Sequence, residues 1–195
     1  MNGESPLAPL VLADLRAWHD WLLRNAGESD GIWLALAKKG ITSPTSLSYQ
    51  EALEEALCEG WIDGQVKTLD ARLFVRRFTP RRRASIWSKR NVELVARLEV
   101  EGRLRAGGLA EIARAKSDGR WERAYAGAAA VEVPAELADA LAANAPASAA
   151  FEALSRTERY SALHPLLIAP TPEVRTRRIA ALIERLAATS ASKAR

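Results

Sequence analysis

The sequence predicts an α+β fold that is mostly helical, with helices covering a small antiparallel sheet of about three strands and a helical region following it. Three observations lead to this prediction. Apolar residues recur at helical spacing near both ends of the chain, three short β-prone runs lie between these segments, and 48% of the 195 residues are apolar. That content is enough for a substantial core. Because three strands need to bury one face, helices are expected to cover the sheet.

The sequence of residues 15–37 predicts a helix followed by the first strand. Leu15, Trp18 and Leu22 recur at helical spacing, and the turn-forming residues 25–31 follow them. Residues 31–37 form a short apolar run that ends at a Lys-Lys-Gly sequence. This run is too short for a helix, so we expect a strand.

A second helix and a β-hairpin are expected next. Ser48 and Glu51 have the spacing of a capping box, in which each side chain satisfies a free backbone amide, and the helix is expected to end at Gly60. The β-prone runs 61–66 and 72–79 are separated by a short connection. They predict a hairpin that ends at Pro80, where the backbone donor is missing.

The rest of the chain is expected to be helical. Either Ser85 or Ser88 is placed to cap a helix that runs to Gly102, and a loop with Gly107 and Gly108 precedes a further helix. That further helix is expected at 109–116. The C-terminal helices are expected at 134–143, at 148–154 and from Thr171 and Pro172 onward, with His164 and Pro165 in a loop.

An alanine-rich stretch without large apolar side chains suggests a soft domain boundary near residue 130. We expect an α+β domain over residues 1–130, a small helical region over 131–188 and a frayed tail over 189–195. No stretch approaches the roughly 18 apolar residues that a membrane span requires. The N-terminus has no basic start followed by an apolar run, so a cytoplasmic location is expected.

Positive charge is concentrated in one segment. Eight lysine and arginine residues and no acidic residue lie between Ala71 and Val92. The net charge of the whole chain is only +4, so the remainder is net negative. Such a cluster attracts a phosphate, a nucleic acid or an acidic protein, although a solvated face balanced by acids in the folded protein remains an equal alternative.

Within this segment, three arginines precede the predicted capped helix. Guanidinium groups offer bidentate contacts to phosphate, and free amides at a helix N-terminus favour an anion. A tryptophan in the same segment is placed to stack on a base or ring. The candidate ligand-binding residues are therefore Arg81, Arg82, Arg83, Trp87, Lys89, Arg90 and Asn91.

Asp63 and Arg77 form the second candidate site. Strand alternation places Arg77 on the side of Leu73 and Val75, where a guanidinium needs a partner because an unpaired buried charge is costly. Asp63 on the other arm of the hairpin is the nearest candidate. The pair either holds the strand register or orients a ligand.

Nucleophilic and metal chemistry are not expected. The single cysteine, Cys58, excludes an internal disulfide and lies at a helix C-terminus, where the dipole raises a thiol pKa, so we expect it to be a buried structural residue. His19 and His164 are far apart in sequence and make no zinc set with it. No P-loop or dinucleotide fingerprint occurs. No catalytic residue, metal or cofactor is therefore assigned.

Several segments resemble the YdeI/OmpD-associated, or bacteriocin-protection, family. The likeness runs roughly from Trp18 to Leu186, and the segments that carry it are 58–64, 77–83, 85–91, 101–109, 115–125 and 175–179. The resemblance implies a role in stress or bacteriocin tolerance and a link to an outer-membrane porin. Because no export signal is present, that link is expected to be indirect at most.

Together these observations predict a protein that binds an anionic small molecule, a nucleic acid or an acidic protein surface and catalyses no reaction. Two alternatives remain open: an enzyme of unknown reaction whose polar site contains Asp63, Arg77, Arg81 and Asn91, and a protein-interaction adaptor. A pocket that holds Asp63, Arg77 and Asn91 would favour the enzyme.

Overall fold

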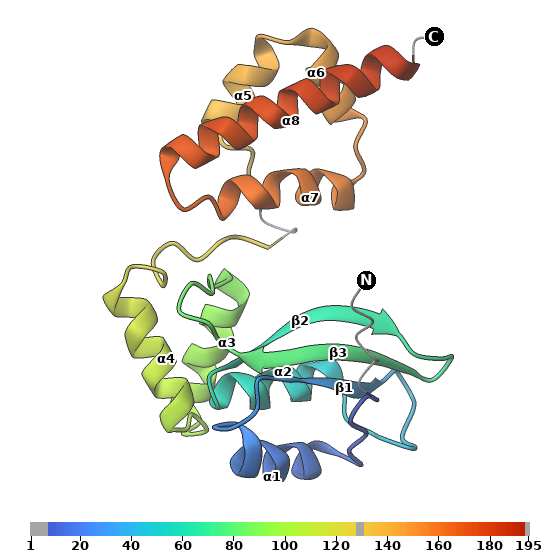
Figure 1. Ribbon diagram of the computed structural model, residues 1–195, viewed down its shortest axis with the longest axis vertical. Helices are drawn as coiled ribbons and strands as arrows, with labels where there is room; N and C mark the ends of the chain where they lie inside the picture. Colours follow the sequence, from blue (N-terminus) through green and yellow to red (C-terminus); the bar gives the residue numbers. More distant parts are fainter. Residues whose placement is uncertain (1–7, 128–130, 194–195) are drawn as a thin grey trace, which may run out of the picture. The chain divides into compact units, whose positions relative to one another are not determined.

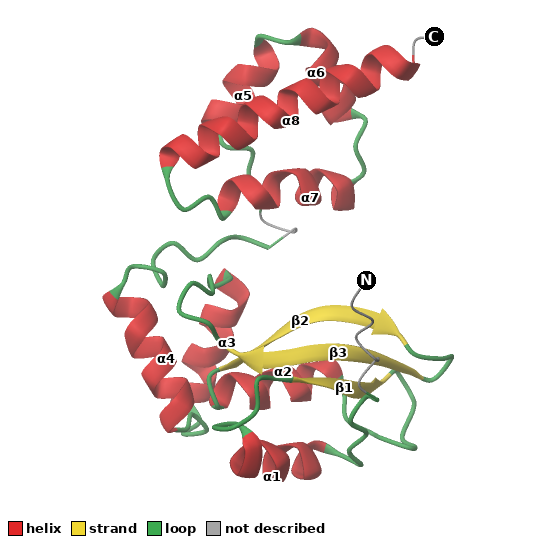
Figure 2. Ribbon diagram, in the orientation of Figure 1, coloured by secondary structure: helices red, strands yellow, loops and turns green. Residues whose placement is uncertain are grey.

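The computed structural model describes residues 8–127 and 131–193. Within these residues it has eight helices and one three-stranded sheet, which confirms the predicted fold class (Figures 1 and 2). No helix among them is long and apolar enough to cross a membrane. The elements are α1 (Leu15–Asn25), β1 (Ile32–Ala37), α2 (Tyr49–Cys58), β2 (Trp61–Thr68), β3 (Leu73–Pro80), α3 (Lys89–Val100), α4 (Ala106–Ser117), α5 (Ala135–Ala142), α6 (Ala145–Glu152), α7 (Arg156–Leu167) and α8 (Pro172–Lys193).

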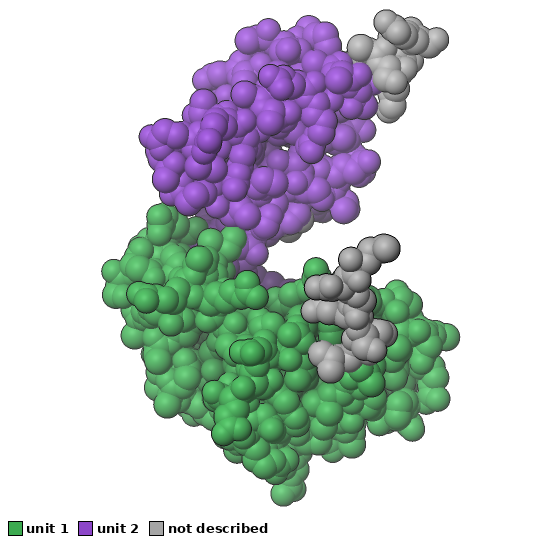
Figure 3. All heavy atoms as spheres, in the orientation of Figure 1, with its two compact units in different colours: residues 1–87, 91–123 green, residues 88–90, 124–195 purple. Residues whose placement is uncertain are grey.

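The chain forms two compact units, one with residues 1–87 and 91–123 and the other with residues 88–90 and 124–195 (Figure 3). The short segment 88–90 joins the second unit because Ser88 forms a bridge with Tyr125 and the Lys89 amide donates to the Tyr125 carbonyl at 2.9 Å. The second unit therefore starts at residue 124, whereas the sequence placed the boundary after residue 130.

The first unit is built on an antiparallel sheet of strand order β1-β3-β2. Its main core lies between α1, α2 and one face of this sheet (Figure 1), and includes Trp18, Leu34, Trp61 and Phe78. The capping box at the start of α2 forms as expected: the Ser48 amide donates to the Glu51 carboxylate at 2.9 Å. The opposite face of the sheet carries a smaller apolar cluster that includes Leu73 and Val75, as strand alternation predicts.

Helix α4 begins at Ala106, so the expected loop around Gly107 and Gly108 is wrong. These glycines lie in the first turn of α4, where it meets the C-terminal end of α2. A Cβ at Gly108 would lie 2.4 Å from the Cys58 carbonyl oxygen, and one at Gly107 would lie 2.6 Å from that of Glu59. The glycines allow the two backbones to approach, and the Arg105 amide donates to the Cys58 carbonyl at 3.1 Å.

The second unit contains α5 to α8 around a core of leucines, alanines, isoleucine and phenylalanine. Helix α7 includes His164 and Pro165, so the expected loop at these residues is wrong. Its start carries a second capping box, in which the Ser155 amide donates to the Glu158 carboxylate at 2.8 Å. Helix α8 continues to Lys193 through residues that were expected to fray.

Candidate functional site

The basic segment is divided by the fold into buried and exposed residues. Arg76 lies on the helix-covered face of the sheet, where it forms an ion pair with Asp63 and its guanidinium carbon lies 4.3 Å from the centre of the Tyr49 ring. The Tyr49 hydroxyl donates to the same carboxylate at 3.0 Å. Asp63 is therefore held by two residues of the folded core.

The predicted pair between Asp63 and Arg77 is wrong. Asp63 is opposite Phe78 in the strand register, so both side chains are on the face that packs against α1 and α2. Arg77 is one residue away and therefore points to the other face, where it is opposite Trp33 of β1. Strand alternation predicted the correct face of the sheet for Arg77. The face on which Asp63 lies depends on the register between β2 and β3, which the sequence alone does not define.

Arg81 and Trp87 are also buried, whereas the sequence predicted them as part of a binding surface. Arg81 is 6% exposed and Trp87 is 1% exposed. The Arg81 guanidinium carbon lies 3.6 Å from the centre of the Trp87 ring, and its Nη1 donates to the Ile86 carbonyl at 3.2 Å. The indole is thus covered by a side chain of its own loop and presents no face to a base. Asn91, at 8% exposed, is also withdrawn from the surface.

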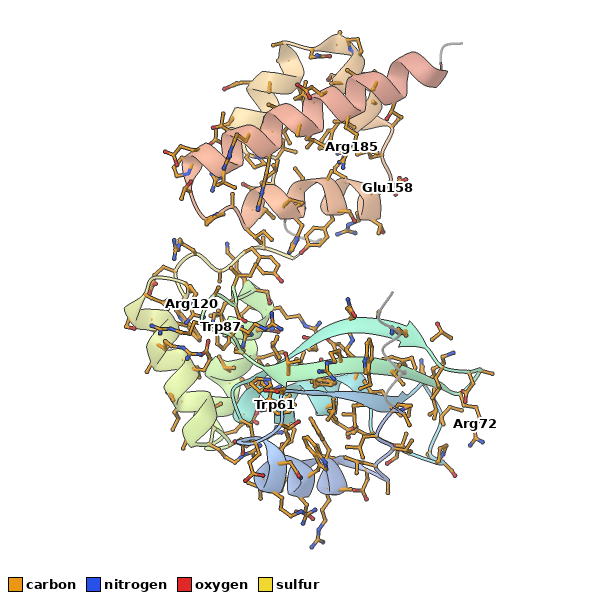
Figure 4. All side chains as sticks on the ribbon, in the orientation of Figure 1. Trp61, Arg72, Trp87, Arg120, Glu158 and Arg185 are labelled. Carbon is orange, nitrogen blue, oxygen red and sulfur yellow. The ribbon has the colours of Figure 1, made fainter. Side chains whose placement is uncertain are left out.

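Residues 81–87 form a loop that the surrounding structure holds in place, and we call it the braced loop. The Arg82 amide donates to the Ser85 hydroxyl at 2.9 Å, and the Ser85 amide donates to the Arg82 carbonyl at 2.8 Å. Ser85 therefore closes a turn and does not cap α3. Nη1 of Arg120 donates to the Ser85 carbonyl at 2.7 Å, which ties this turn to the segment after α4 (Figure 4).

Arg120 is itself held by two carboxylates, one in α4 and one directly after it. Its Nη1 lies 3.0 Å from Oε1 of Glu111, and its Nε lies 2.8 Å from the Asp118 carboxylate. Glu111 is 4% exposed and also pairs with Arg114. The sequence reasoning missed Arg120 and Glu111 as supports of the loop. The only local signal was the short spacing of Asp118 and Arg120, because Glu111 is brought to Arg120 by the fold.

Arg82 and Arg83 are the exposed arginines of the braced loop. Across the described parts of the chain, neither forms an ion pair, whereas Arg76, Arg114 and Arg120 each face a carboxylate. The fold thus neutralises several arginines and leaves this adjacent pair uncompensated. Lys89 and Arg90 are exposed in the first turn of α3 and belong to the second unit.

A cavity of about 270 Å³ lies at the base of the braced loop. It is bounded by the end of α2, by β2 and β3, and by α4, and its lining includes Glu59, Trp61, Arg81, Glu111 and Arg114. A larger cavity of about 670 Å³ lies in the second unit. Neither of these two cavities is lined by Asp63, Arg77 or Asn91, so neither provides the pocket that the enzyme alternative requires.

Other ionisable groups of the first unit form an ion-pair network along α2. Glu55 lies 2.7 Å from Nδ1 of His19 and 2.7 Å from Nη1 of Arg105. Burial alone would raise the pKa of Glu55, but the hydrogen bond from His19 and the charge of Arg105 outweigh it and lower the pKa below its ordinary value. His19 therefore packs against a structural carboxylate. In the second unit, burial lowers the pKa of His164.

Cys58 is fully buried at the end of α2, as predicted. Burial, followed by the negative charge of Glu55, raises the pKa of its thiol from 9.0 to about 11. Among residues 8–127 and 131–193, no three His, Cys, Asp or Glu side chains are grouped to hold a metal ion.

We expect native Cys58 to react with a thiol reagent at pH 9 at least about tenfold more slowly than a cysteine peptide, because little thiolate forms and the sulfur is inaccessible. Its protonated form also stabilises the fold. The raised pKa makes this contribution complete below pH 9 and removes it as the pH rises towards 11. Labelling in urea should reach the peptide rate, and equal rates for native protein and peptide would show an accessible thiolate.

Two family models match the chain. Residues 10–111 match a family described as a domain of unknown function, DUF8412. Residues 130–189 match the family described as bacteriocin-protection, YdeI or OmpD-associated, which confirms the resemblance seen in the sequence. Of the segments that carried this resemblance, only 175–179 lies within the second match. Searches of curated proteins and of solved structures find no match.

Proposed function

Since the chain belongs to the DUF8412 family, whose description states no activity, we propose its function from the braced loop: the protein binds phosphate-bearing anions through Arg82 and Arg83. Residues 130–189 match a family described by bacteriocin protection, and this match supports the proposal that such binding serves tolerance to bacteriocins.

The arginines within and around the braced loop differ in whether a carboxylate neutralises them, and this difference carries the proposal. Arg120 holds the braced loop through the Ser85 carbonyl, and both Arg120 and Arg114 have acidic partners outside the loop. Arg82 and Arg83 are exposed at its turn and face no carboxylate within the described residues. Two adjacent guanidinium groups supply the paired donors that a phosphate accepts, and their positive charge is not cancelled by the fold.

The supports of the loop also favour binding. Hydrogen bonds at 2.7–2.9 Å fix the turn between Arg82 and Ser85 and link it to Arg120. A ligand that binds a held loop has less backbone motion to restrict, so more of the contact free energy appears as affinity.

The contacts available at this loop are suited to phosphate groups and not to bases. Trp87 is buried beneath Arg81, so it offers no stacking surface. Contacts to phosphate position a ligand but carry no sequence information. If the anion is a nucleic acid, we therefore expect binding that is insensitive to base sequence and steeply weakened by salt.

Replacing Arg82 and Arg83 together with Ala is expected to abolish binding of tripolyphosphate and to weaken binding of short oligonucleotides. Each lost phosphate contact should reduce the log–log salt slope by about 1. The melting temperature should stay the same, because exposed charges contribute little to folding. Titrations at several salt concentrations, with DNA and RNA of mixed and homopolymer sequence, measure these effects.

The matched control is Arg16→Ala combined with Arg24→Ala, which removes the same charge from two exposed positions of α1. It should leave binding unchanged. Equal weakening by the control pair would mean that only net charge matters. A folded wild-type protein that binds none of these anions at low salt would refute the proposal and leave an acidic protein surface as the partner to test.

A further inference from the structure

The cavity of about 670 Å³ lies wholly within the second unit, between α6, α7 and α8. Its volume falls within the range of about 300–1,000 Å³ that is typical of small-molecule sites. Its lining residues are Ala149, Ala150, Ala153, Leu154, Thr157, Glu158, Ser161, Ala162, Arg185, Leu186 and Thr189.

The cavity exists because α6 contributes alanines where longer side chains would fill the space between the helices. Ala149 and Ala150 belong to α6, and Ala153 follows directly as its C-cap residue. Buried Ala162 of α7 and Leu186 of α8 complete an apolar lining. A methylene chain placed here would remove apolar surface from water on both sides of the contact.

The polar side chains of the lining are those of Thr157, Glu158, Ser161, Arg185 and Thr189. Some are already used within the fold: the Glu158 carboxylate accepts from the Ser155 amide and hydroxyl at 2.8 and 2.6 Å, and the Thr189 hydroxyl donates to the Arg185 carbonyl at 2.9 Å. The guanidinium of Arg185 is different. In the described part of the chain it has no carboxylate or carbonyl partner.

Arg185 and Glu158 come from different helices, α8 and α7, and both border the cavity (Figure 4). Because Glu158 is engaged at the first turn of its own helix, its charge is partly balanced by the backbone amides there. The exposed guanidinium thus supplies an unsatisfied positive charge at the edge of a cavity whose α6 side is lined by alanines and Leu154. A ligand that matches both features has an apolar chain and a single anionic head.

We propose that this cavity binds a single-chain anionic amphiphile of the fatty-acid type, with the alkyl chain against the alanines of α6 and the carboxylate at Arg185. The site is separate from the braced loop, which lies in the other unit. The two proposals therefore stand or fall independently.

Calorimetric titration of the full chain with decanoate, below its micelle concentration, tests the proposal. We expect saturable binding of decanoate, at least about tenfold weaker binding of decanol, which has no charge, and no binding of decyltrimethylammonium, which has the opposite charge. Backbone amide NMR shifts should be confined to residues 149–162 and 185–189. Vesicles that contain phosphatidylglycerol distinguish the source of the anion, and binding to vesicles without binding to decanoate would overturn the proposal.

Two variants with matched controls locate the site. Ala149→Phe fills the cavity at an exposed position of α6 and should abolish decanoate binding, whereas Ala138→Phe, on the exposed part of α5, should not. Arg185→Gln should weaken decanoate binding about tenfold, whereas Arg177→Gln on the same helix should leave it unchanged.

Melting temperatures of each variant and its control are compared first, so that loss of fold is not read as loss of binding. Arg82→Ala with Arg83→Ala should bind decanoate as the wild type does. Undiminished binding by both Ala149→Phe and Arg185→Gln, or NMR shifts centred outside α6, α7 and α8, would overturn the proposal.

Discussion

Glu111→Ala is expected to lower the free energy of unfolding by about 3 kcal/mol. Glu111 is 4% exposed, and it is the carboxylate that faces both Arg120 and Arg114. Its removal leaves the Arg120 guanidinium buried with one fewer counter-charge, and an uncompensated buried charge is strongly destabilising. Because Asp118 still contacts Arg120 at 2.8 Å, the loss should fall at the lower end of the range for broken buried pairs. Urea denaturation measures it.

The control for this prediction is Glu99→Ala, at an exposed position of α3, which should change stability by less than about 0.5 kcal/mol. Replacing both partners, with Glu111→Leu and Arg120→Met, should cost less than Glu111→Ala alone, since no buried charge remains. If Glu111→Ala unfolded at the wild-type urea concentration with an unchanged slope, the pair would contribute nothing to the fold.

Gly108→Ala is expected to destabilise the protein by about 1–3 kcal/mol, although alanine is the better helix former by about 1 kcal/mol. The added Cβ would lie 2.4 Å from the Cys58 carbonyl oxygen and 3.0 Å from that of Leu57. Both contacts are with backbone atoms at the end of α2, which cannot rotate away as a side chain does. The ends of α2 and α4 must separate, which stretches the 3.1 Å hydrogen bond from the Arg105 amide to Cys58.

Gly27→Ala is the matched control, because a Cβ there meets no atom within 4 Å. It should be neutral or slightly stabilising in the same thermal and urea measurements, since alanine restricts the unfolded chain. A Gly108→Ala variant at least as stable as wild type would mean that the two helices separate without cost.

Local patterns in the sequence were sufficient to predict most of the helices and strands. The capping box at Ser48 and Glu51 predicted the start of α2 because both partners lie within one turn of the chain. A second capping box at Ser155 and Glu158 carried the same information for α7, but the proline within the last turn of that helix favoured a loop in the sequence reasoning. The side of the sheet on which Arg77 lies also followed from alternation along its own strand.

What the sequence determined by itself is therefore the fold class, most helix and strand positions, the family resemblance and the local excess of positive charge. Only the tertiary structure decided which charges remain available. The carboxylates that face Arg76 and Arg120, those of Asp63 and Glu111, are brought to them by strand register and helix packing. Helix caps act within a few residues, whereas ion pairs depend on distances in space that no sequence spacing specifies. The same arginine-rich segment is thus partly core and partly surface: Arg81 is buried against the Trp87 ring, whereas Arg82 and Arg83 are exposed.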